Sequence, residues 1–267
     1  MTTSRPPARL FDLTGRTALV TGGGTHLGRA MAEGLAEQGA SVVLAGRRTE
    51  VVEASAAAMR AAGLASRAVT LDVTDPDDVE SVFATVAAEI GPLDILVCNA
   101  GASFETSYPP DTDLDQFRRT MEVNAVGTLL CAQAAARQMG PRGSGAIVTV
   151  SSIHGSLAAD PRLYEGIDMR IRSGPGYQAG KAAVLALTRN LAAELGPLGI
   201  RVNCISPGYF PSEKSDPEFV ERCRRRNPLG TFGSPEDLKG AVVLLASDAS
   251  RFMTGANLMV DGGWSIW

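Results

Sequence analysis

Short apolar runs alternate with longer amphipathic stretches along the whole chain of 267 residues. Apolar runs of strand length lie at 17–21, 41–45, 67–71, 93–97, 146–150, 200–204 and 256–260. Stretches of helical length lie at 26–38, 75–90, 113–139, 177–195 and 235–246, and one more follows the second strand and ends at about residue 62. Parallel strands need crossover helices and are buried on both faces of their sheet. The pattern therefore predicts an α/β chain with a doubly wound, seven-stranded parallel sheet, helices on both faces and a single domain.

Two stretches interrupt this alternation, and both follow a predicted strand. Residues 156–175 contain Pro, Gly and three Arg, whereas residues 208–228 contain three Pro and a run of charges. Ligands of doubly wound sheets bind in loops at the carboxyl ends of strands. We therefore expect two substrate loops in a domain that spans 11–267, preceded by a flexible arm at 1–10.

A glycine-rich segment, Thr21-Gly-Gly-Gly-Thr-His-Leu-Gly28, joins the first strand to the first helix. Such a turn lets the backbone approach a pyrophosphate, which the free N–H groups of the helix then bind. The strand before it and the helix after it favour a Rossmann dinucleotide site over a turn without function. A mononucleotide P-loop is disfavoured, because no Gly-Lys-Ser/Thr follows. The predicted cofactor contacts here are Gly22, Gly24, Thr25, His26 and Leu27.

The end of the second strand bears on the choice of cofactor. It reads Ala45-Gly46-Arg47-Arg48, without the acidic residue that hydrogen-bonds the ribose 2′-OH of NAD. A guanidinium suits the 2′-phosphate of NADP. Arg47 and Arg48 therefore favour NADP(H), with NAD(H) as the alternative, although the same charges could simply be solvated at a helix start.

Tyr177 and Lys181 stand four residues apart and share one face of a predicted helix. A free Tyr has a pKa near 10, which is too high for ready proton transfer at neutral pH. A neighbouring cation stabilises the phenolate and lowers this pKa. Tyr177 is therefore the candidate general acid or base.

Further motifs follow the later strands and identify a family resemblance. They are Asp72-Val73, Cys98-Asn-Ala-Gly101, Asn124 in Met-Glu-Val-Asn, Ser152 in Val-Ser-Ser-Ile-His-Gly, Pro207-Gly208 and Val260-Asp-Gly-Gly263. With the glycine turn and the Tyr177–Lys181 pair, they make the chain from residue 11 to its end resemble the short-chain dehydrogenase/reductase family.

The resemblance implies a role for each matching residue. Hydride would move between C4 of the nicotinamide and a carbinol or carbonyl carbon, with no metal required. The implied catalytic set is Ser152 on the substrate oxygen, Tyr177 for proton transfer, Lys181 on the nicotinamide ribose and Asn124 on a water leading to Lys181. The implied cofactor contacts are Asp72 and Val73 beside the adenine, Asn99, Ala100 and Gly101 on the ribose side, and Pro207, Gly208 and Ser212 near the carboxamide or phosphate.

The chain departs from the family pattern at three positions. His26 occupies a position where the family turn has Gly, so its side chain must tolerate that backbone or face the cofactor. Cys98 replaces the first Asn of Asn-Asn-Ala-Gly, and Ser212 replaces a Thr while keeping a hydroxyl. None of these departures removes a catalytic group.

The substrate is less well specified than the cofactor. Ser152 and Tyr177 are 25 positions apart, longer than the common family spacing, and the polar segment 159–166 falls between them. This segment favours a small hydroxylated or acidic substrate, as does a resemblance to gluconate 5-dehydrogenase-like sugar and polyol dehydrogenases. The alternatives are a 3-oxoacyl-[acyl-carrier-protein] reductase and a catalytically silent, nucleotide-sensing member of the fold. The candidate substrate contacts are His154, Tyr164 and Tyr209.

Composition excludes several other classes of protein. The formal net charge of −4 provides no electrostatic reason to bind nucleic acid. No run of 18 apolar residues and no apolar signal-peptide core is present, so we expect a cytoplasmic protein with no membrane partner. The four cysteines lack metal or disulfide spacing. The family resemblance implies a homotetramer or homodimer built on the helices at 113–139 and 177–195.

Overall fold

A single parallel sheet forms the centre of the molecule. The computed structural model describes residues 10–167, 173–212 and 215–267, so nearly all of the predicted arm lies outside the described residues, as do 168–172 and 213–214 of the predicted loops. The sheet has seven strands in the order β3-β2-β1-β4-β5-β6-β7, which confirms the predicted architecture. Its strands are β1 Thr17–Thr21, β2 Ser41–Gly46, β3 Ser66–Thr70, β4 Leu93–Cys98, β5 Gly145–Val150, β6 Ile200–Pro207 and β7 Asn257–Val260.

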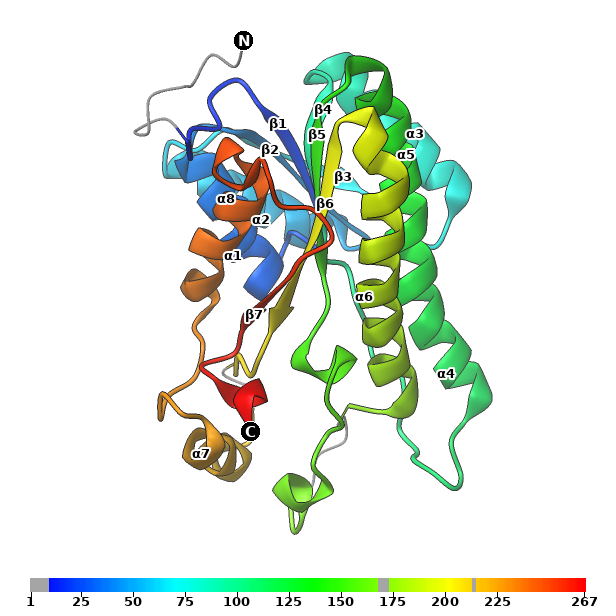
Figure 1. Ribbon diagram of the computed structural model, residues 1–267, viewed down its shortest axis with the longest axis vertical. Helices are drawn as coiled ribbons and strands as arrows, with labels where there is room; N and C mark the ends of the chain where they lie inside the picture. The colour runs from blue at the N-terminus through cyan, green and yellow to red at the C-terminus, as the bar shows by residue number, and fades with distance from the viewer. Residues whose placement is uncertain (1–9, 168–172, 213–214) are drawn as a thin grey trace.

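Helices cover both faces of this sheet (Figure 1). One face is covered by α1 His26–Glu37, α2 Thr49–Ala61 and α8 Lys239–Ala246. The other face is covered by α3 Pro76–Glu89, α5 Gly127–Met139 and α6 Pro175–Leu195, with α4 Leu114–Met121 leading into α5. The alternation along β1 explains this arrangement, because Ala18 and Val20 pack in one core cluster and Leu19 packs in the other.

Three elements differ from the sequence-based expectation. The helix expected at 113–139 is interrupted by a π-helical turn, Glu122–Val126, which separates α4 from α5. Helix α6 begins at Pro175, two residues before the predicted start, since Pro is favoured in the first turn of a helix. The predicted loop 208–228 contains a helix, α7 Pro217–Arg226, whose first amides are capped by the Asp216 carboxylate.

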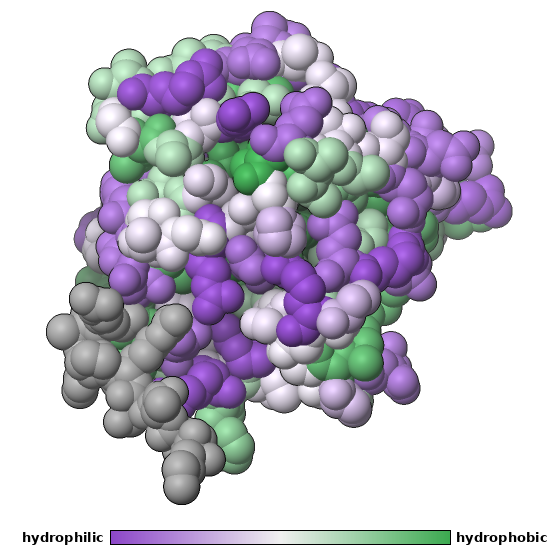
Figure 2. Space-filling view, turned by 90° about the horizontal axis from the view of Figure 1, so that it is seen from above, coloured by the Kyte–Doolittle hydropathy of each residue, from purple (hydrophilic) through white to green (hydrophobic). Residues whose placement is uncertain are grey.

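The topology places the candidate loops at one end of the molecule. Strand β1 pairs with β2 on one side and with β4 on the other, so the strand order reverses there. Ligands of such sheets bind at the carboxyl ends of the strands beside this reversal. The opposite end, seen in Figure 2, has hydrophilic and hydrophobic residues interspersed on its surface. Within the described residues, no helix has the length and apolar character needed to cross a membrane.

Candidate active site

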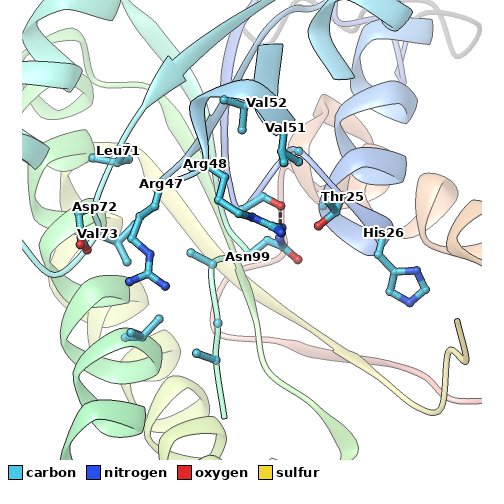
Figure 3. A pocket seen from close by; sticks show the side chains of 18 of the residues that line it. Thr25, His26, Arg47, Arg48, Val51, Val52, Leu71, Asp72, Val73 and Asn99 are labelled. Carbon is cyan, nitrogen blue, oxygen red and sulfur yellow. Dashed lines mark hydrogen bonds between the residues drawn. The ribbon is translucent and has the colours of Figure 1, made fainter. Parts of the chain in front are cut away.

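A cavity of about 360 Å³ opens at the carboxyl ends of β1 to β4. Most of the predicted cofactor contacts line it: Gly22, Gly24, Thr25, His26, Leu27, Arg47, Arg48, Asp72, Val73, Asn99, Ala100 and Gly101. Figure 3 shows the side chains of Arg47, Asp72 and Asn99 around this space. The cavity thus combines the helix start, the cationic strand end and the turn after β4 that a dinucleotide site requires.

The glycine turn is packed too tightly for side chains at its last position. A Cβ on Gly28 would overlap with the carbonyl oxygen of Gly22 and with Nδ2 of Asn99. Asn99 Nδ2 donates hydrogen bonds to the carbonyls of Thr21 (3.0 Å) and Gly22 (3.1 Å). The Oγ1 atom of Thr21 accepts the N–H groups of Asn99 (3.1 Å) and Ala100 (3.0 Å). The turns after β1 and β4 therefore hold each other in place.

His26 adopts the left-handed backbone conformation that the family turn reserves for Gly. Its φ is 47°, a value that costs energy for a residue with a Cβ. The ring points away from Arg47 and Asp72 in Figure 3, and Nε2 donates a hydrogen bond to the Phe210 carbonyl oxygen (3.0 Å). His26 thus links the glycine turn to the loop after β6, while its backbone still lines the cavity.

Arg47 and Asp72 lie at the end of the cavity formed by β2 and β3. Burial acts to raise the pKa of Asp72, but hydrogen bonds from the Thr74 amide and hydroxyl and the charge of Arg47 outweigh it, so the pKa lies below its ordinary value. Asp72 is therefore an anion, held by the Thr74 amide and hydroxyl and subject to the charge of Arg47. Arg47 and Arg48 are both exposed, which leaves their guanidinium groups free to meet a phosphate.

A second cavity, of about 310 Å³, adjoins the first. It is lined by Ser152, Tyr177, Lys181, Pro207 and Gly208 among the predicted site residues. Leu27, Asn99, Gly101 and Ala102 line both cavities. An extended dinucleotide could therefore pass from the glycine turn to Tyr177 without leaving the site.

Burial dominates the titration of the proposed catalytic pair. It raises the pKa of Tyr177, against a hydrogen bond with Ser152 that acts to lower it. Burial also lowers the pKa of Lys181 to about 8. The ammonium lies 5.7 Å from the Tyr177 ring centroid and donates to the Val150 carbonyl oxygen (2.9 Å). The net shift of the Tyr177 pKa is therefore upward, with burial as its largest cause, and the expectation that Lys181 lowers this pKa stays a prediction.

Asn124 is fully buried in the π-helical turn, behind Gly101. Its Nδ2 donates to the carbonyl oxygens of Ala102 (2.6 Å) and Thr120 (2.9 Å), and its Oδ1 accepts the Ala102 amide (3.3 Å). A Cβ on Gly101 would lie 2.9 Å from Asn124 Oδ1 and 3.1 Å from Lys181 Nζ. The structure therefore brings Asn124 and Lys181 to the same side of Gly101.

The three candidate substrate contacts gather in an aromatic cluster next to the second cavity. Tyr209 Oη lies 3.3 Å from His154 Nε2, and its ring packs edge-on against Trp264, with 4.7 Å between the ring centroids. Tyr164 and Phe219 of α7 belong to the same cluster. None of His154, Tyr164 and Tyr209 is among the residues that line either described cavity, and Ser212 also lies outside both.

Sequence reasoning missed several residues that shape the site. Val51, Val52 and Leu71 line the first cavity, and Ala102 and Ser103 extend the predicted Asn99–Gly101 segment. Ser55 of α2 is buried and donates to the Gly24 carbonyl oxygen (2.6 Å), which ties that helix to the glycine turn. The signal for Val51 and Val52 was their place in the helical turn that follows Arg48.

Comparison with known proteins yields matches along nearly the whole chain. Residues 24–265 match the model of a family described as Enoyl-(Acyl carrier protein) reductase. A gluconate 5-dehydrogenase of Gluconobacter oxydans is 38% identical over 96% of this chain and 97% of its own length. A cis-4-hydroxycyclohexanecarboxylate dehydrogenase of Sinomonas cyclohexanicum is 40% identical over 94% of this chain and 96% of its own.

Solved structures show the same likeness. A gluconate 5-dehydrogenase from Burkholderia cenocepacia, crystallised with NADP and tartrate, superimposes with a TM-score of 0.87 at 35% identity, over 97% of this chain and 98% of that one. Because the family model matches residues 24–265 and these relatives are 35% or more identical over nearly the whole chain, the chain belongs to the short-chain dehydrogenase/reductase family of oxidoreductases.

Proposed function

We propose that the chain is an NADP(H)-dependent dehydrogenase that interconverts a secondary alcohol and a ketone in a small sugar acid or polyol. The observation that carries this proposal is the pair of adjoining cavities, one lined by the glycine turn and Arg47, the other by Ser152, Tyr177 and Lys181. A nicotinamide dinucleotide fits these two cavities. Gly28 has no Cβ, so the glycine turn can pack closely against it, and the start of α1 presents backbone amides without a side-chain cap. When bound, it supplies or accepts the hydride.

The side chains divide the remaining chemistry among them. The Ser152 hydroxyl is placed to hydrogen-bond the substrate oxygen beside Tyr177. In the direction of reduction, Tyr177 donates its phenolic proton to the carbonyl oxygen while hydride reaches the carbonyl carbon; in oxidation the proton returns to Tyr177. Lys181 places its ammonium 5.7 Å from the Tyr177 ring centroid and can bind the cofactor ribose. Asn124 keeps this end of the site in place through its bonds to the chain at Ala102 and Thr120.

The proposed substrate class rests on the relatives and on the loops. Relatives similar along the whole chain act on gluconate and on cis-4-hydroxycyclohexanecarboxylate, both hydroxylated acids, and others are named for galactitol and D-threitol. Arg222 of α7 donates to the Glu165 carbonyl oxygen (2.6 Å), and Arg226 pairs with Asp160, so two cations join the two proposed substrate loops. These arginines are paired with Asp160 and Glu218, so the loops contribute to the proposal through the polar segment 159–166, which suits an acidic or hydroxylated substrate better than an acyl chain.

A substrate panel tests the proposed class. Initial rates with NADP⁺ are measured for sugar acids, polyols and cyclic hydroxy acids, and rates with NADPH for β-ketoacyl thioesters. Turnover of the first group supports the proposal. Turnover confined to the thioesters would replace it with the acyl-carrier-protein reductase alternative, and tight NADPH binding without turnover of any alcohol or ketone would favour a silent sensor.

We predict that Arg47 sets the preference for NADP(H). Arg47→Ala should raise the KM for NADPH about 10-fold and leave the KM for NADH nearly unchanged, because a charge-assisted hydrogen bond to phosphate contributes about 1.5–3 kcal/mol and exposure of Arg47 reduces this. Steady-state kinetics with both cofactors measures the effect. Arg67→Ala, at an exposed position of β3 outside the cavity, is the control. Equal changes for the two cofactors would contradict the assignment.

The titration of Tyr177 predicts opposite pH dependences for the two directions. Oxidation needs the phenolate as base, whereas reduction needs the protonated phenol as acid. Because burial raises the pKa of Tyr177, most of the phenol is protonated at neutral pH. The kcat for oxidation should therefore rise with pH above neutrality, and the kcat for reduction should fall only at alkaline pH. Profiles from pH 6 to 10 check this, and an oxidation rate that declines over this range would contradict it.

We also propose that the chain assembles as a homotetramer or homodimer through α4 and α5, which together replace the predicted helix 113–139, and through α6, which lies beside α5 in Figure 1. Ala182 and Ala186 of α6 are exposed, and small side chains permit close approach of a second helix. Light scattering on the purified chain measures the assembly. The cytoplasmic location and the lack of a metal requirement stay predictions.

A further inference from the structure

Glu105 is a buried carboxylate that has no role in the reaction proposed above. It lies between β4 and α4, and it is 1% exposed. Its Oε1 accepts a hydrogen bond from the backbone N–H of Tyr177 (3.1 Å). Its Oε2 accepts hydrogen bonds from the hydroxyls of Thr120 (2.8 Å) and Ser103 (3.2 Å). Burying a carboxylate is costly unless such donors satisfy it. Three donors on one buried carboxylate indicate that its position is specified.

The contact with Tyr177 lies at the start of helix α6. Tyr177 is the third residue of that helix, where an N-terminal amide has no partner within the helix. The residue before the helix is Gly174, which has no side chain to cap it. Glu105 accepts this amide from a different segment of the chain, and the positive end of the helix dipole favours its negative charge.

The glycines around Pro175 make room for this carboxylate. A Cβ on Gly176 would overlap with Glu105 Oε1, and a Cβ on Gly174 would lie 2.8 Å from Glu105 Cβ. Neither glycine has a positive φ within the described backbone, so conformation alone does not require them. The sequence Gly174-Pro175-Gly176 is therefore matched to Glu105.

The other carboxylate oxygen reaches the helix that leads to Asn124. Thr120 is fully buried in α4, and its carbonyl oxygen accepts Asn124 Nδ2 (2.9 Å). One side chain thus connects the turn that carries Tyr177 with the turn that holds Asn124. We propose that Glu105 is a positioning residue that sets the Tyr177 phenol relative to Ser152 and Asn124, an inference that rests on the proposed oxidoreductase function.

Two substitutions separate positioning from simple folding. Glu105→Ala leaves the Tyr177 amide and the Thr120 hydroxyl without this acceptor, and a misplacement of about 1 Å can cost about 100-fold in rate. We expect kcat to fall by about that factor while the Kd for NADPH stays near the wild-type value. Glu105→Gln should recover most of the activity, because its Oε1 can still accept the Tyr177 amide and the two hydroxyls can turn to accept its N–H groups.

Hydrogen exchange provides a readout that does not depend on turnover. The Tyr177 amide should exchange faster in Glu105→Ala than in the wild type or in Glu105→Gln, whereas amides in the middle of α6 should not change. Glu122→Gln, at an exposed position of the π-helical turn Glu122–Val126, is the matched control and should leave both kcat and exchange unchanged. If Glu105→Ala does not fold, Glu105→Asp, which keeps the charge but is one methylene shorter, replaces it with the same expected results.

The outcomes separate this inference from the proposed function. Unchanged Tyr177 exchange and unchanged kcat would overturn the inference. The inference would also be overturned if Glu105→Ala lost kcat and NADPH binding only in proportion to its loss of folded protein, as measured by circular dichroism. If the wild-type chain turned over no alcohol or ketone, the proposed function would fail. The exchange experiment would still test whether Glu105 accepts the hydrogen bond of the Tyr177 amide.

Discussion

Tyr177→Phe is expected to reduce kcat by about 100-fold to 10,000-fold in both directions, the range typical of a lost general acid or base. The substitution removes only the hydroxyl that hydrogen-bonds with Ser152, so the ring still fills its place beside Lys181. Binding of NADPH should stay near the wild-type value, because the glycine turn and Arg47 are unaffected. Stopped-flow or steady-state rates together with fluorescence titration of NADPH measure the two quantities.

The control for this substitution is Tyr108→Phe, which removes a phenolic hydroxyl outside both described cavities. It should leave kcat within the error of the wild type. A Tyr177→Phe variant that retained wild-type turnover would refute the proton-transfer role, and one that lost NADPH binding as well would indicate that the phenol is structural.

The second large effect is expected for Gly28→Ala. The new methyl group would overlap with the Gly22 carbonyl oxygen and Asn99 Nδ2, so the start of α1 must move away from the turn. Overpacking of this kind costs about 1–3 kcal/mol. We expect a loss of stability in that range and a rise of at least about 10-fold in the Kd for NADPH, since about 1.4 kcal/mol of lost interaction with the pyrophosphate changes affinity tenfold. Thermal melting and cofactor titration measure both.

Gly240→Ala is the matched control, because it adds the same methyl group to a glycine of α8 with no heavy atom within 4 Å of the new Cβ. It should stabilise the chain by about 0.5–1 kcal/mol, since Ala is the better helix former. Equal stability and NADPH affinity of Gly28→Ala and the wild type would show that the turn has room that the structure does not display.

The sheet could be predicted from the sequence because each strand is marked by the hydrophobic pattern of its own few residues. Each of the five inner strands is a short, mostly buried apolar run, and β1 alternates between two core clusters, so the hydrophobic pattern alone identifies them. The π-helical turn at Asn124 was missed, because a helix with one widened turn keeps nearly the same amphipathic pattern. Helix α7 was missed because its charged residues mask a short apolar face at Phe219 and Cys223.

By itself, the sequence determined the fold class and the family, and it predicted the residues of the cofactor turn and of the catalytic pair, since each depends on spacing along one strand, turn or helix. Tertiary structure decided what depends on distant segments meeting: that Lys181 bonds the Val150 carbonyl, that burial raises the pKa of Tyr177, and that His26 reaches Phe210. It also decided that Glu105, which belongs to no motif used here, caps the helix of Tyr177. Burial and hydrogen bonding between remote segments are set by packing, and no local pattern encodes them.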